Sequence, residues 1–217
     1  MENVNPNPNN PSESNNFSEF TDEVKSFYTG TFPALIKKFF KDPLHGIRQI
    51  FEKATEQGFM NSLILYGSVF VLYLVSMLIL ESRMGFANAL KSSLMPVIMM
   101  FMVTAVSFGI KSISGKPNFK KELLTGALCG IPLIFFIAFA IIMKIFSGNS
   151  IASPYGIGGM GWLSIAVTFY VFIMMVNVLQ QSLLAAKTNE TFAWYIAPAG
   201  ILVAVFISSR IVINLLM

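Results

Sequence analysis

Five long apolar runs decide what this chain can fold into. They cover residues 59–80, 94–110, 123–143, 162–184 and 192–217. A helix rises about 1.5 Å per residue, so roughly 20 apolar residues cross the hydrocarbon core of a bilayer. Backbone polar groups inside lipid must be paired within the segment itself, which favours helices over open sheets. The runs therefore predict an all-α polytopic membrane protein with a five-helix transmembrane bundle.

The composition agrees with this prediction and divides the chain into three parts. Hydrophobic residues make up 54% of the chain and charged residues 12%, whereas a soluble domain carries about 25% charged residues. The acidic residues concentrate before residue 59. We expect a disordered Asn- and Pro-rich tail over 1–16, a cytoplasmic amphipathic helical segment over 17–58, and the transmembrane domain over 59–217.

The segment before the first span is amphipathic and basic. Apolar residues recur at helical spacing over 32–57, and Asp42-Pro43 suits a helix start, so two helices should meet there. Such a segment can lie at the membrane surface with its cations toward anionic headgroups. Its apolar face can also pack on the bundle or on a partner, and the two alternatives are compatible. The membrane-surface candidates are Lys37, Lys38, Lys41, Arg48 and Lys53.

The positive charges indicate an orientation for the five spans. With the N-terminus inside, the inner side collects Lys37, Lys38, Lys41, Arg48, Lys53, Lys111, Lys116, Lys120, Lys121 and Lys187. The outer side collects only Arg83, Lys91 and Lys144. Because cytoplasmic loops are enriched in Lys and Arg, we expect a cytoplasmic N-terminus and an external C-terminus. The Asn-rich tail favours a bacterial cytoplasmic membrane.

The residues offer little material for catalysis or cofactor binding. Cys129 and His45 are single, and the apolar runs contain no Asp, Glu or His, so neither a metal centre nor a nucleophile with its base can be assembled. Gly156, Gly158 and Gly161 have the spacing of a dinucleotide-binding loop, but no strand precedes them. We therefore expect no enzyme activity, cofactor, catalytic residue, nucleotide or nucleic acid.

Several residues inside the runs are better explained by packing. Gly126 and Gly130 have the small-residue spacing that lets membrane helices approach closely, and Pro132 predicts a kink. Asn177, Gln180 and Gln181 are expected to bridge helices. Lys144 and Arg210 lie near span ends, where long cationic side chains reach the headgroups.

The chain resembles the Yip (Ypt-interacting) family over about residues 35–217. The stretch FFKDPLHGIRQIFEKA at 39–54 looks like the segment before span one in bacterial members, and FKKELLTGALCGIPLIFF at 119–136 is similar to the family's entry into span three. Eukaryotic members carry an Asp-Leu-Tyr-Gly-Pro motif before span one, and here residues 42–46 read DPLHG. Binding of a small GTPase is therefore not carried over.

The resemblance implies a non-catalytic membrane protein that associates with other membrane proteins or with itself and that organises the bilayer. The alternative is a subunit of a small-solute transporter or channel, although an odd number of spans without an internal repeat weakens it. A polar cavity in the bundle would favour transport, and a tightly packed interior would favour the organising role.

Overall fold

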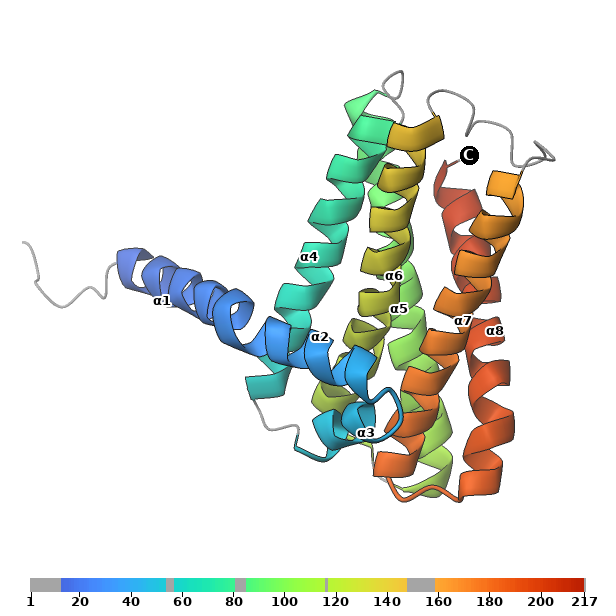
Figure 1. The fold of residues 1–217 in the computed structure, drawn as a ribbon. Helices are drawn as coiled ribbons and strands as arrows, with labels where there is room; N and C mark the ends of the chain where they lie inside the picture. Colours follow the sequence, from blue (N-terminus) through green and yellow to red (C-terminus); the bar gives the residue numbers. More distant parts are fainter. Residues whose placement is uncertain (1–12, 54–56, 81–84, 116, 148–158, 217) are drawn as a thin grey trace, which may run out of the picture.

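The computed structural model describes residues 13–53, 57–80, 85–115, 117–147 and 159–216, and these fold mainly into helices (Figure 1). The N-terminal helices are α1 (Glu13–Ser26), the π-helical turn η1 (Phe27–Thr31), α2 (Phe32–Lys41) and α3 (His45–Glu52). The long helices are α4 (Gln57–Leu80), α5 (Phe86–Ser114), α6 (Phe119–Ser147), α7 (Gly159–Ala185) and α8 (Glu190–Leu216).

Within the described residues, five helices, α4 to α8, are long and apolar enough to cross a membrane. They pack as a bundle in which α6 contacts α4, α5 and α7, while α5 and α7 also contact α8. Half of the apolar window of α6 is buried in the bundle, compared with 28% for α4 and for α7, so α6 is the central helix. The chain is an integral membrane protein with an all-α, five-span bundle, which confirms the predicted fold class.

The two ends of the bundle differ in what they carry. We call the end with the α5–α6 and α7–α8 connections the proximal end, and the opposite end the distal end. The C-terminus lies at the distal end, whereas α3 lies near the proximal end (Figure 1). The odd number of spans accounts for this separation.

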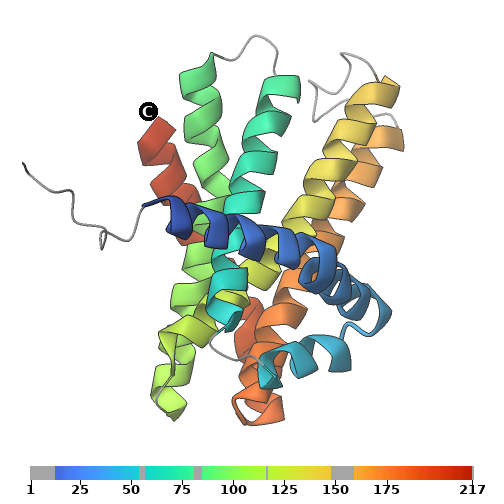
Figure 2. The same cartoon turned by 90° about the vertical axis from the view of Figure 1, so that its left-hand side faces the viewer.

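Helices α2 and α3 lie against the outside of the bundle, whereas α1 projects away from it (Figure 1). Helices α1, η1 and α2 follow one another along a bent rod, after which the chain reverses into α3 (Figures 1 and 2). The Tyr28 and Ser68 hydroxyls are hydrogen-bonded, and the Phe40 ring lies 6.3 Å from the Phe135 ring, measured between centroids. Helix α3 packs against α7. These contacts attach η1, α2 and α3 to α4, α6 and α7.

Helix boundaries differ from the predicted runs mainly at their polar ends. Helix α5 extends on both sides of the predicted span 94–110, and α8 begins at Glu190 rather than at 192. Lys and Ser stop an apolar run without stopping a helix, because their side chains reach water while the backbone stays paired. Helix α1 begins at Glu13, so residues 13–16 of the predicted disordered tail are helical. The rest of that tail lies outside the described residues, as do Gly156 and Gly158, whereas Gly161 lies in α7.

Candidate functional site

Helices α2 and α3 form a hairpin whose turn is stabilised by Asp42. Asp42 Oδ1 accepts a hydrogen bond from the backbone N–H of His45 at 3.0 Å. This is the bond that an N-cap carboxylate makes, and it bears out the predicted meeting of two helices near Asp42. It also holds the pKa of Asp42 below its usual range. The cap is therefore present while the carboxyl is ionised.

Gly46 brings the two helices of the hairpin into close contact. A Cβ atom at Gly46 would lie 2.6 Å from the backbone oxygen of Lys38, a distance that real Cβ contacts do not show. Gly46 N–H also donates to the Asp42 carbonyl at 2.8 Å. The start of α3 is therefore held directly against the end of α2.

The five predicted membrane-surface cations are all exposed, but the structure divides them into two groups. Lys37, Lys38 and Lys41 line a groove of about 640 Å³ between α2 and α3. In the other group, Arg48 pairs with Glu52 at 3.0 Å and Lys53 caps the end of α3. We call the groove the lysine groove, and its lining residues are Ala34, Lys37, Lys38, Lys41, Asp42, Gly46 and Gln49.

The apolar face of the hairpin packs on the protein. Phe39 and Ile47 are fully buried. Asn177 on α7 donates from Nδ2 to the Pro43 carbonyl at 2.7 Å, which joins the hairpin turn to the bundle. For α3, the structure therefore shows packing on the bundle, one of the two alternatives that the sequence leaves open. The lysine-bearing face of α2 remains exposed beside it.

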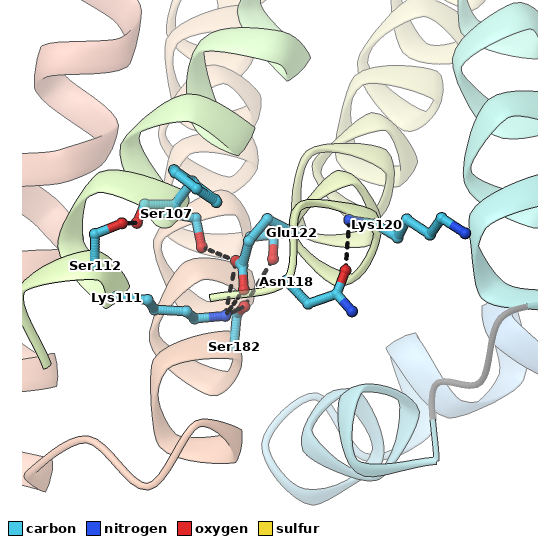
Figure 3. Close-up of polar contacts among 9 residues, drawn as sticks. Ser107, Lys111, Ser112, Asn118, Lys120, Glu122 and Ser182 are labelled. Carbon is cyan, nitrogen blue, oxygen red and sulfur yellow. Dashed lines mark hydrogen bonds and ion pairs between the residues drawn. The ribbon is translucent and has the colours of Figure 1, made fainter. Parts of the chain in front are cut away.

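A second polar site lies at the proximal end, between α5, α6 and α7 (Figure 3). Lys111 Nζ donates to both carboxylate oxygens of Glu122, at 2.9 and 2.8 Å, and to Ser182 Oγ at 2.7 Å. Ser107 Oγ donates to Glu122 Oε2 at 2.6 Å, and the Thr125 and Ser182 hydroxyls lie 2.7 Å apart. The side chains of Lys111 and Glu122 are 10% and 4% exposed, so this is a buried ion pair.

A cavity of about 510 Å³ adjoins this ion pair. It is lined by both members of the pair and by Ser182, and further charges come from Glu52 and Lys121. Over the described ranges, every buried side-chain nitrogen or oxygen has a hydrogen-bond partner. Through its bond to Ser182, the ion pair joins three helices. The cavity next to it offers charges of both signs to a polar solute.

The apolar pattern of the sequence does not predict this ion pair. Glu122 comes one residue before the third apolar run and Lys111 one residue after the second, so neither counts as lying inside a run. The signal that could have found them is the pair of opposite charges on either side of a short connection between two neighbouring helices. Such a connection brings the two helix ends together. The apolar runs contain no Asp, Glu or His, but the carboxylate of Glu122, just outside a run, is buried.

The predicted packing glycines lie where α6 meets α4 and α5. A Cβ at Gly126 would lie 2.2 Å from Tyr66 Oη and 2.3 Å from the Met100 carbonyl oxygen. A Cβ at Gly130 would lie 2.8 Å from the terminal methyl of Met100. Pro132 lies inside α6, two residues further on. The middle of the bundle is therefore packed closely around α6.

The cations and amides near the span ends make specific contacts. Lys144 Nζ donates to the carbonyls of Ile79, at 2.7 Å, and Leu80. It thus satisfies carbonyls at the end of α4, where positive charge is favourable, instead of only reaching the headgroups. Arg210 lies over the Phe206 ring, 5.5 Å from its centroid. Gln181 donates to Asn177 Oδ1 at a long 3.4 Å.

Comparisons with known proteins give no further assignment. No family model, curated protein or solved structure matches this chain. The part of the chain that the structure describes contains no group of three or more His, Cys, Asp or Glu side chains that could hold a metal ion. The hairpin and the buried ion pair are therefore the features that bear on function.

Proposed function

We propose that this chain is a non-catalytic integral membrane protein of the Yip type, which organises the bilayer by binding other membrane proteins and the membrane surface. The observation that carries the proposal is the docked hairpin. Its apolar face packs against the bundle, while Lys37, Lys38 and Lys41 stay exposed. A cationic surface on a lipid-embedded bundle suits contact with anionic headgroups or acidic partners. We place this surface in the cytoplasm, because lysines are frequent in and beside the proximal connections. We place it in a bacterial cell because of the Asn-rich tail.

Photo-crosslinking in native membranes tests this proposal. A benzophenone amino acid replaces Gln49, which is exposed on α3. In a matched protein it replaces Phe206, which is exposed in the C-terminal half of α8. After irradiation, crosslinked proteins are identified by mass spectrometry. We expect a defined set of membrane proteins at Gln49 that is missing at Phe206. Identical sets at the two positions would contradict the proposal.

A subunit of a small-solute transporter is the second candidate, favoured by the cavity beside the Lys111–Glu122 pair. Swelling of proteoliposomes in small polar solutes distinguishes it from the organising role. Under our proposal, vesicles with the protein swell no faster than empty ones. Faster swelling that Glu122→Gln reduces would favour transport.

A further inference from the structure

Three ammonium groups share the lysine groove. Lys37 and Lys41 lie one turn apart on α2, and Lys38 lies beside them, so the three side chains face the same hollow. Among the described residues, none of the three has an ion-pair or hydrogen-bond partner. Asp42 also lines the groove, but its Oδ1 already accepts from the His45 N–H. The groove therefore carries surplus positive charge and suits an anion with several acceptor oxygens.

A row of exposed aromatic rings leads from the groove onto the membrane-spanning surface. Phe40 lies three residues after Lys37 on α2, and so borders the lysine face. Its ring contacts Phe135 on α6 at 6.3 Å, and Phe135 contacts Tyr170 on α7 at 6.0 Å, both between centroids. The three residues are 43%, 42% and 43% exposed. We call them the aromatic row.

We propose that the hairpin binds one anionic phospholipid, with its phosphate in the lysine groove and an acyl chain along the aromatic row. This inference rests on the proposed function, because it names the ligand of the same basic surface. A free phosphate would use only the groove. A phospholipid also covers the apolar rings that continue from the groove into the span, so the surface fits an amphiphile better than an inorganic anion.

Lipid retention by the full-length protein tests the proposal. The protein is reconstituted in bilayers of phosphatidylcholine with a minor fraction of phosphatidic acid, extracted gently, and analysed by native mass spectrometry. We expect one retained phosphatidic acid per chain. In Lys37→Gln/Lys38→Gln/Lys41→Gln, the affinity should fall about fivefold for each lysine, or roughly a hundredfold in all.

A matched variant separates a specific site from general attraction. Lys25→Gln/Lys53→Gln/Lys187→Gln removes the same charge from positions outside the groove, and it should retain the lipid as the wild type does. Equal losses in the two triple variants would overturn the groove as a site and leave a diffuse basic surface, as the proposed function requires. Unchanged retention in both variants would overturn the lysine groove as the lipid site. It would also count against the proposed role of the basic surface in binding the membrane.

Two further experiments address the source of the phosphate and the role of the aromatic row. Inorganic phosphate, added at constant ionic strength, should not displace the lipid. Full displacement would identify a free-phosphate site instead.

Phe40→Ala and Phe135→Ala should each weaken retention severalfold with all lysines in place, because each removes part of the aromatic row. Phe206→Ala, which changes an exposed ring away from the row, is the control. No difference from it would remove the acyl-chain part of the proposal.

Discussion

Lys187 holds a backbone conformation that lysine seldom adopts. Its φ angle is 59°, the one positive value among the described non-glycine residues. It follows the end of α7, where Lys187 N–H donates to Leu184 O at 2.9 Å and Thr188 N–H donates to Leu183 O at 3.2 Å. These two bonds make a Schellman motif, in which the left-handed position is normally glycine. The α7–α8 connection therefore carries local strain at a single residue.

Lys187→Gly should stabilise the protein. Glycine adopts a left-handed conformation without a Cβ clash, so we expect a gain of about 1 kcal/mol in the free energy of unfolding. Thermal unfolding in detergent, followed by circular dichroism, should show a rise in Tm. Lys187→Ala removes the same charge and keeps the strain, so it should show no such rise. A gain shared by both variants would attribute the effect to charge.

At the scale of helices, the close approach of α6 to α4 and α5 depends on Gly126. Gly126→Ala should destabilise the bundle by about 1–3 kcal/mol, because the added methyl meets Tyr66 Oη and the Met100 carbonyl at under 2.5 Å. Gly109→Ala on α5 is the matched control, since a Cβ there meets nothing within 4 Å. Equal Tm values for the two variants would show that the atoms around Gly126 accommodate the methyl group without loss of stability.

The buried pair should behave as a unit that links α5 to α6. Lys111→Met or Glu122→Leu alone leaves one buried charge uncompensated. Each should cost about 3 kcal/mol, the low end of the usual range, because the pair lines a cavity and is not fully enclosed by side chains. The double variant removes both charges and should recover most of this loss. Chemical denaturation in mixed micelles measures the three variants. Additive losses would mean that the two groups do not interact.

How far the sequence predicts these elements depends on whether the signal is local. Run length alone predicts the five spans, because a membrane helix needs only its own apolar residues. Asp42-Pro43 predicts the hairpin turn, because capping is local too. The sorting of Lys37, Lys38 and Lys41 from Arg48 depends on Gly46 setting the distance between two helices. The Lys111–Glu122 pair depends on how α5 and α6 meet. Both are tertiary facts that a one-dimensional pattern does not contain.

At the scale of the whole molecule, most of the lysines lie toward the proximal end of the bundle. The ion pair and its cavity lie where α5 ends and α6 begins, which is the proximal end. Helix α3 lies near the same end, while the C-terminus lies at the distal end (Figure 1). Since basic connections favour the cytoplasm, we expect the proximal end to face it. If the orientation holds, the lysine groove faces the leaflet where anionic lipids meet cytoplasmic partners.

Labelling of single cysteines tests that orientation. Gln49→Cys lies on α3 and Asn214→Cys near the end of α8, and both positions are exposed. The native Cys129 is fully buried, so it should not react with a membrane-impermeant maleimide. In intact cells we expect labelling at position 214 alone, and at position 49 only after permeabilisation. The reverse pattern would show that the Lys and Arg bias does not orient this chain. Labelling of both from one side would mean that one of the five apolar helices does not cross the membrane.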